Sequence, residues 1–224
     1  MIEQPHSIAA RVAAVEDIAA DIRILRLAPD TPLAFQAGQY LYLEAAGFDA
    51  RAFSIASAPE DPLLELHIRG AGHGISQHIF SLRPGDALAV RGPLGTNVLR
   101  EGAGPLLVLA GGIGIAPMKA IVESRLKRGD TSKLYLYWGV RDQSQLYLGA
   151  LFETLAQKYP HFHYVPVPQD EKGYIGDAVK ADLPDLSAFS VYLAGPRPMI
   201  DATTSALLAN GARTDHIFSD AFSA

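Results

Sequence analysis

The chain has 224 residues, of which 49% are hydrophobic and 19% charged, and its formal net charge is -5. This length suits one large domain or two modest ones, and the composition excludes a disordered or fibrous protein. An acidic balance without a block of Lys and Arg argues against a nucleic-acid partner. The sequence has no cysteine, so redox chemistry in these residues needs an organic cofactor rather than thiols or a Cys-ligated cluster.

The ends and apolar runs of the chain give no sign of membrane insertion. The segment Met1-Ile2-Glu3-Gln4-Pro5-His6 is not a basic leader, and the longest apolar run, residues 106–118, is too short and glycine-rich to span a bilayer. We therefore expect no membrane partner and a cytoplasmic location.

The first hundred residues are typical of short strands separated by turns. Predicted strands cover residues 21–27, 40–43, 51–57, 64–69 and 87–91. Residues 64–69 alternate apolar and polar side chains, which is typical of a strand, and a short helix is predicted at 76–82. Strands at this spacing predict a small antiparallel barrel.

From Pro105 onward, strands and helices alternate. Predicted strands cover 106–110, 133–138, 163–167, 190–194 and 216–219, and predicted helices cover 116–128, 148–159 and 197–210. Continuously apolar strands between helices predict a doubly wound parallel sheet. The boundary falls at residues 100–104, giving domains 1–102 and 103–224.

Two glycine-rich turns each lead from a strand into a helix. In Gly111-Gly112-Ile113-Gly114-Ile115-Ala116-Pro117 the backbone amides are suited to a phosphate, although Ala116-Pro117 stands where a dinucleotide fingerprint has another glycine. In Gly70-Ala71-Gly72-His73-Gly74-Ile75-Ser76 the same chemistry recurs, with Ser76 as a plain N-cap in the alternative reading. For the first turn, the alternative to a phosphate site is a tight turn with no ligand. Two such turns in two dissimilar domains suit the binding of a dinucleotide and of a second phosphorylated cofactor.

The segment Arg51-Ala52-Phe53-Ser54 carries three useful side chains. Arg51 and Phe53 share one strand face, and Ser54 lies on the other unless the strand bends or ends there. These groups suit a phosphate, a stacked planar ring and a ring nitrogen. A half-buried barrel strand with a surface arginine explains them equally well.

Other chemistries are poorly supported. His161 and His163 would share a strand face, but no third ligand stands in register, so we expect solvent-facing histidines and no metal. No Gly-x-Ser-x-Gly elbow marks a serine hydrolase.

Eight segments, in order, resemble the ferredoxin-NADP reductase superfamily, in particular NAD(P)H:flavin oxidoreductases and oxygenase reductase components. They are Phe35-Gln36-Ala37-Gly38-Gln39-Tyr40, Arg51-Ala52-Phe53-Ser54, Gly74-Ile75-Ser76, Gly92-Pro93-Leu94-Gly95, the Gly111 turn, Tyr137-Trp138-Gly139-Val140-Arg141, Gly195-Pro196-Arg197-Pro198-Met199 and Phe218-Ser219-Asp220-Ala221-Phe222.

The resemblance implies a flavin-binding Greek-key barrel followed by an NAD(P)-binding α/β domain. It implies flavin contacts from Arg51, Ala52, Phe53, Ser54, His67, Ile68, Gly74, Ile75 and Ser76. It implies nucleotide contacts from Gly112, Gly114, Pro117, Arg141, Gly195, Pro196 and Met199. Ser54 would act near flavin N5, and Asp220 and Phe222 would supply an acid and an aromatic ring near the flavin.

Two positions depart from the pattern of many relatives. Ala194 replaces a cysteine before the Gly-Pro pair, and Phe53 replaces a tyrosine in the flavin strand. Each change removes one polar contact, so we expect weaker positioning of the cofactors rather than loss of the chemistry.

The resemblance implies hydride transfer from NAD(P)H to flavin N5. With no cysteine for a fused iron–sulfur domain, we expect a separate acceptor: a ferredoxin, an oxygenase or a small molecule. The alternatives are a reductase of free FMN, FAD or riboflavin and a regulatory electron-transfer subunit. We expect retained FAD, with FMN as the alternative, and NADH rather than NADPH, because Asp142 opposes the charge of Arg141.

Overall fold

The structure is a computed structural model that describes residues 6–19, 21–70, 73–102 and 104–222, with the backbone alone for residues 221 and 222. The chain divides into two compact units. The first contains the chain up to Leu99 together with Lys119–Ser124, and the second contains Arg100–Met118 and the chain from Arg125 onward. No helix among the described residues is long and apolar enough to cross a membrane.

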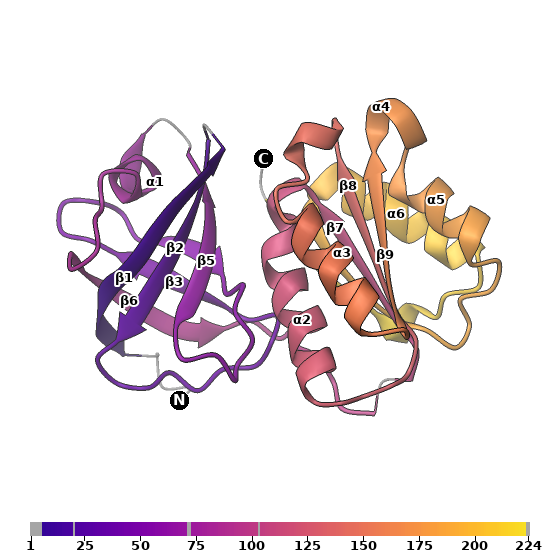
Figure 1. Cartoon of the computed structure of the whole chain (residues 1–224), viewed down its shortest axis with the longest axis horizontal. Helices are drawn as coiled ribbons and strands as arrows, with labels where there is room; N and C mark the ends of the chain where they lie inside the picture. The colour runs from indigo at the N-terminus through magenta and orange to yellow at the C-terminus, as the bar shows by residue number, and fades with distance from the viewer. Residues whose placement is uncertain (1–5, 20, 71–72, 103, 223–224) are drawn as a thin grey trace. The chain divides into compact units, whose positions relative to one another are not determined.

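The first unit is built on a six-stranded antiparallel sheet (Figure 1). Its strands are β1 (Ser7–Ala19), β2 (Ile22–Pro29), β3 (Tyr40–Glu44), β4 (Arg51–Ser54), β5 (Leu64–Arg69) and β6 (Ala87–Leu94), in the spatial order β4-β3-β6-β1-β2-β5. The two edge strands meet where Ile55 forms an isolated bridge with Leu66 and the Ala56 amide donates to the Glu65 carbonyl at 2.7 Å. This closure confirms the predicted antiparallel barrel.

The structure corrects three local predictions in this unit. Strand β1 was not predicted, because its alanines and acidic residues have a low preference for strands. Its hydrogen bonding to both β2 and β6 makes it a strand in the structure. The strand predicted over 51–57 ends at Ser54. Helix α1 covers Gly74–Ile79 instead of 76–82.

Strand β5 has the predicted bounds, and it is buried on both of its faces. Its first five residues are all buried, including Glu65 at 8% and His67 at 4% exposure. The alternation is genuine, but its polar face is covered too, which requires partners for both side chains.

The second unit is built on a five-stranded parallel sheet, as predicted, and the strand order is β11-β10-β7-β8-β9. Its strands are β7 (Leu106–Gly111), β8 (Leu134–Val140), β9 (Phe162–Pro168), β10 (Ser190–Pro196) and β11 (Ile217–Phe222). Helices α2 (Ile115–Lys127) and α3 (Gly149–Lys158) cover one face, and α5 (Ile175–Asp182) and α6 (Arg197–Ala209) cover the other (Figure 1). The short helix α4 (Gln169–Lys172) precedes α5, and neither was predicted.

The order of the strands fixes where this sheet can bind a ligand. The chain runs from β7 outward to β8 and β9, then returns to the other side of β7 with β10 and β11. The switch point therefore lies between β7 and β10, and ligands of open α/β sheets bind outside the carboxyl ends of the strands at such a point. The turn after β7 and the Gly195-Pro196 pair at the end of β10 both stand there.

Candidate functional site

In the first unit, residues of strand β4 and helix α1 meet at the Arg51 side chain. Its guanidinium Nη1 donates to Ser76 Oγ at 2.8 Å, and its Cζ lies 5.9 Å from the centre of the Phe53 ring. Arg51 is exposed, whereas Ser76 is buried at 1%. The strand alternation thus puts Arg51 and Phe53 on one face, and the chain brings Ser76 to them across 25 residues.

Ser76 is not the N-cap of its helix. Helix α1 begins at Gly74 after His73, and no side chain caps it. Ser76 is its third residue and turns its hydroxyl to Arg51. Ala71 and Gly72 of the predicted glycine-rich turn lie outside the described residues.

Helix α1 is held by an arginine that the sequence analysis missed. Arg23 on β2 donates to the carbonyls of Ile79 at 3.0 Å and Leu82 at 3.3 Å, which fixes the C-terminal end of the helix that carries Ser76. The Asp17 carboxylate balances the charge of Arg23 and accepts two hydrogen bonds from its guanidinium, at 2.6 and 2.8 Å. Hydrogen bonding to Arg23 lowers the pKa of Asp17. An arginine inside the apolar run Ile22 to Leu25 was the available signal.

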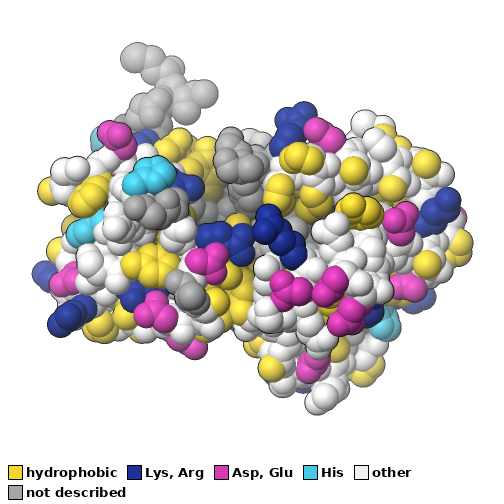
Figure 2. All heavy atoms as spheres, turned by 90° about the horizontal axis from the view of Figure 1, so that it is seen from above, with side chains coloured by type: hydrophobic (Ala, Val, Ile, Leu, Met, Phe, Trp, Pro, Cys, Tyr) yellow, Lys and Arg dark blue, Asp and Glu magenta, His cyan; other side chains and the backbone are white. Residues whose placement is uncertain are grey.

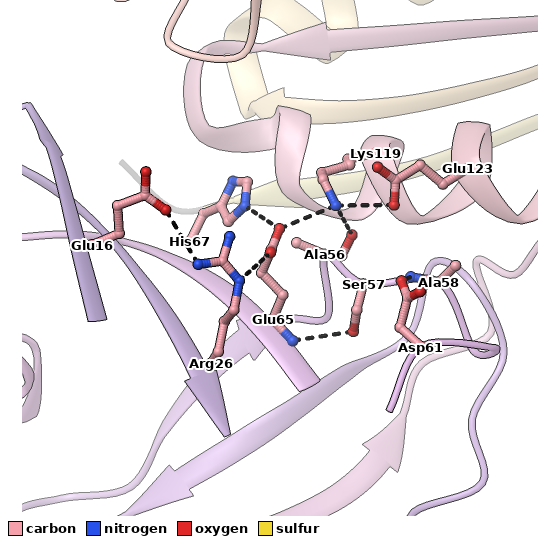
Figure 3. A network of polar contacts seen from close by, with 10 residues as sticks. All are labelled: Glu16, Arg26, Ala56, Ser57, Ala58, Asp61, Glu65, His67, Lys119 and Glu123. Atoms are coloured by element: carbon pink, nitrogen blue, oxygen red, sulfur yellow. Dashed lines mark hydrogen bonds and ion pairs between the residues drawn. The ribbon is translucent and has the colours of Figure 1, made fainter. Parts of the chain in front are cut away.

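The buried polar face of β5 forms a charged network (Figure 3). Glu65 Oε1 contacts Lys119 Nζ at 3.1 Å and His67 Nε2 at 3.0 Å, and Glu65 Oε2 accepts from Arg26 Nε at 3.0 Å. Lys119 also donates to Glu123 at 3.0 Å. Cations and a hydrogen-bond donor therefore surround the buried carboxylate, as its burial demands.

These contacts set the charge states of the network. Burial alone would raise the pKa of Glu65, but the His67 hydrogen bond and the Lys119 charge hold it well below its ordinary range. Burial would likewise lower the pKa of Lys119, but Glu123 and Glu65 raise it overall. Burial lowers the pKa of His67 despite Glu65, so His67 is neutral at pH 7 and donates through Nε2.

The network fixes the segment that follows the Arg51 strand. The Glu65 amide donates to Ser57 Oγ at 3.1 Å, and Lys119 reaches the Ala56 carbonyl at 3.5 Å. Because the His67 ring is fully buried in this network, only the backbone of His67 is left to meet a cofactor. The Ile68 side chain is similarly enclosed in the barrel core.

In the second unit, the turn after β7 packs directly on the residues that end β10. A Cβ added to Gly114 would lie 2.2 Å from the Ala194 carbonyl oxygen, and one added to Gly111 would lie 2.3 Å from Met199 Sδ. Gly112 has φ +53°, which favours glycine. Pro117 is in the first turn of α2, as predicted.

Three further predicted residues lie along the same sheet edge. Arg141 directly follows β8 and is exposed, while its neighbour Asp142 accepts the Ser144 amide at 3.0 Å. Asp220 on β11 pairs in register with Ala194, and burial raises its pKa. Phe222 pairs with Pro196, and its side chain lies outside the described atoms.

The two histidines singled out in the sequence, His161 and His163, lie in different surroundings. His161 precedes β9 and is half-buried, whereas His163 is exposed and its ring stacks on Tyr135 with centroids 4.6 Å apart. Within the described residues, no group of three His, Asp or Glu side chains is placed to hold a metal ion.

On the face shown in Figure 2, basic side chains lie beside acidic ones.

Comparison with known proteins identifies the family. Residues 9–98 match the model of the oxidoreductase FAD-binding domain, and residues 108–205 match that of the oxidoreductase NAD-binding domain. The chain belongs to the ferredoxin reductase-like family of flavin oxidoreductases. It is an NAD(P)H-dependent oxidoreductase with FAD- and NAD-binding domains, as the resemblance implied.

Its relatives include both kinds of reductase that the sequence suggested. The chain is 36% identical over 221 residues to the ferredoxin–NAD(P)(+) reductase component of the Pseudomonas putida naphthalene 1,2-dioxygenase system, covering 94% of this chain and 67% of that protein. It is 33% identical over 228 residues to the NAD(P)H-flavin reductase of Aliivibrio fischeri, covering 95% and 97%. The crystal structure of the Amycolatopsis cytochrome P450 reductase GcoB superimposes with a TM-score of 0.89 at 32% identity, covering 99% of this chain and 72% of that chain.

Proposed function

We propose that residues 1–102 bind FAD, that residues 103–224 bind NAD(P)H, and that electrons pass from the flavin to a separate protein acceptor. The observation that carries this proposal is that one chain matches both an FAD-binding and an NAD-binding oxidoreductase domain. When bound, the flavin supplies the chemistry by accepting a hydride at N5.

The residues around Arg51 fit a flavin phosphate. A guanidinium next to a hydroxyl offers charge-assisted donors for phosphate oxygens, and the Arg51–Ser76 contact already brings these two groups together. Phe53, half-buried beside Arg51, offers an apolar ring for stacking on the isoalloxazine. Ala52, Gly74 and Ile75 would then contribute backbone contacts.

The residues at the sheet switch point fit a pyridine nucleotide. Gly112 takes φ +53°, and Gly114 lets the turn pack against the Ala194 carbonyl. The turn shaped in this way leads to the start of α2, where unpaired amides and the helix dipole favour an anion such as a phosphate. Pro117, Gly195, Pro196 and Met199 would frame the nicotinamide half, and Arg141 would face the adenosine half.

In the reaction, the chain's own residues orient the reactants and manage protons. Ser54, at the end of β4, would donate its hydroxyl near flavin N5, and proximity would supply most of the rate. Asp220 is the candidate acid, and burial raises the pKa of its carboxyl above the ordinary value.

We propose a ferredoxin or an oxygenase as the physiological acceptor. The support is the relative from Pseudomonas putida, which is named as a reductase component of a dioxygenase system. NADH remains the proposed donor over NADPH, and retained FAD is preferred over FMN. The cytoplasmic location stays a prediction from the sequence.

The absorption spectrum of the purified protein before and after anaerobic addition of NADH tests this function, with the released cofactor identified by chromatography. We expect a yellow protein that contains FAD and bleaches. A colourless protein that oxidises NADH only with added flavin would make free flavin the substrate. A protein that does neither would contradict the proposal.

The Ser54→Ala variant tests the assignment within the site. The expected result is a slower reduction of the flavin by NADH with little change in nucleotide affinity, measured by stopped-flow absorbance. An unchanged reduction rate would remove Ser54 from the mechanism.

A further inference from the structure

Trp138 is the single tryptophan of the chain, and it is fully buried near the end of β8. Its position in the sheet is opposite Ala110 of β7, directly before the glycine-rich turn. The edges of its ring meet Tyr147, with centroids 5.2 Å apart at 85°, and Phe152, with centroids 6.1 Å apart at 82°. These neighbours hold the indole in one orientation.

The indole makes one polar contact, and that contact is with the turn. Trp138 Nε1 donates to the Gly112 carbonyl at 2.9 Å. The same carbonyl also accepts from the backbone amide of Ile115, which ends the short 3₁₀ helix Gly112–Gly114. Two donors therefore fix the direction of the Gly112 carbonyl, and only one of them is local to the turn.

Fixing this carbonyl also fixes the amide that follows it. The Gly112 carbonyl and the Ile113 N–H belong to one planar trans peptide, in which the two bonds point in opposite directions. Since the carbonyl points to Trp138, the Ile113 N–H points away from the indole. Gly112 needs such an external hold, because glycine at φ +53° has little conformational preference of its own.

We propose that Trp138 is a positioning residue for NAD(P)H: it locks the Gly112–Ile113 peptide so that the Ile113 N–H is aimed at a nucleotide phosphate. This inference rests on the proposed binding of NAD(P)H at the Gly111–Pro117 turn. Trp138 itself does not touch the nucleotide, and its indole does not titrate, so it acts only through the geometry of the turn.

The matched test compares Trp138→Phe with Phe152→Leu in the flavin-containing protein. Phenylalanine keeps an aromatic ring, removes the donor and leaves part of the buried indole volume empty. Phe152→Leu reduces the packing around the indole and keeps the donor. We expect NAD⁺ to bind about tenfold more weakly to Trp138→Phe, because a partly buried carbonyl loses a partner. Titration calorimetry with NAD⁺ should show little change in affinity for Phe152→Leu, although that variant is less stable.

Kinetics give a second readout that general damage would not reproduce. For Trp138→Phe the KM for NADH should rise about tenfold, while the flavin reduction rate at saturating NADH stays close to wild type. Equal NAD⁺ affinity for wild type and Trp138→Phe, or an equal loss in Phe152→Leu, would overturn the inference.

The wild-type protein provides a test that does not depend on the variant folding. One tryptophan gives one indole N–H resonance in a ¹⁵N spectrum, and this resonance should shift when NAD⁺ saturates the protein. A stationary resonance in a protein that binds NAD⁺ would contradict the role of Trp138. A wild-type protein that does not bind NAD⁺ at all would instead contradict the proposed function.

Discussion

The two candidate cofactor regions are built by different means. Around Arg51 the contacts are polar side chains from distant segments, with Ser76, Arg23 and the Glu65 network each contributing charge or hydrogen bonds. Around the Gly111 turn the contacts are close packing without a side chain on the turn's own glycines, since Gly114 lies against the backbone of Ala194 and Gly111 lies against the side chain of Met199. The first region should therefore be sensitive to the loss of charge, and the second to the gain of atoms.

The largest effect is expected from adding one methyl group at Gly114. In Gly114→Ala the new Cβ would lie 2.2 Å from the Ala194 carbonyl oxygen, which is backbone in the middle of a sheet and cannot move cheaply. We expect a loss of about 4 kcal/mol in the free energy of unfolding, at the upper end for overpacking. Gly149→Ala, whose new Cβ has no neighbour closer than 3.8 Å, is the control for urea denaturation.

The next effect tests the charged network of the first region. Lys119→Met leaves the buried Glu65 without its main cation, and we expect a loss of about 3 kcal/mol. The double variant Lys119→Met with Glu65→Leu should recover much of this loss, because it removes the uncompensated charge. Denaturation of the four proteins gives the coupling energy, and strictly additive losses would show that the two residues act independently.

A smaller effect is expected at Arg51, and on binding rather than stability. Arg51→Leu should weaken flavin binding by about 2 kcal/mol, the usual scale for a charge-assisted hydrogen bond. Because Arg51 is exposed, the thermal stability of the flavin-free protein should change little. Arg11→Leu, another exposed arginine of the barrel, is the control, and equal flavin affinity in the two variants would exclude Arg51 from the site.

The smallest expected effect is a change in acid stability. Burial lowers the pKa of His67 in the folded protein. Below pH 6.5, the ordinary pKa of histidine, the unfolded chain therefore binds a proton at His67 that the folded chain does not bind. Stability therefore falls as pH drops below 6.5, and it falls again below 4.5, the ordinary value for Glu65, whose pKa is also lowered. Thermal unfolding of His67→Gln should lose the first decline, while His163→Gln at the surface should keep it.

Much of the architecture was predictable because periodicity and turn residues report on local structure. The parallel sheet followed from its apolar strands, and the Gly111 turn followed from its glycines. Strand β1 and helix α5 were missed, since the pairing of β1 on both edges and the packing of α5 against α6 depend on tertiary contacts.

The side chains that support the sites were the harder part to predict. Arg23, Lys119 and Trp138 act through partners 26 to 63 residues away in sequence for which no local pattern exists, such as the Gly112 carbonyl for Trp138. Burial of Glu65 and His67 was hidden because an alternating strand is normally exposed on its polar face.

The membership of Lys119–Ser124 in the first unit has a consequence for synthesis on the ribosome. Domains generally fold as units during translation, with the N-terminal one first. The buried Glu65 forms an ion pair with Lys119, and Lys119 is synthesised only after strand β7 of the second unit. The N-terminal barrel therefore completes its folding after synthesis of the second unit has begun, and a chain cut at the boundary between the units would leave Glu65 without this cation.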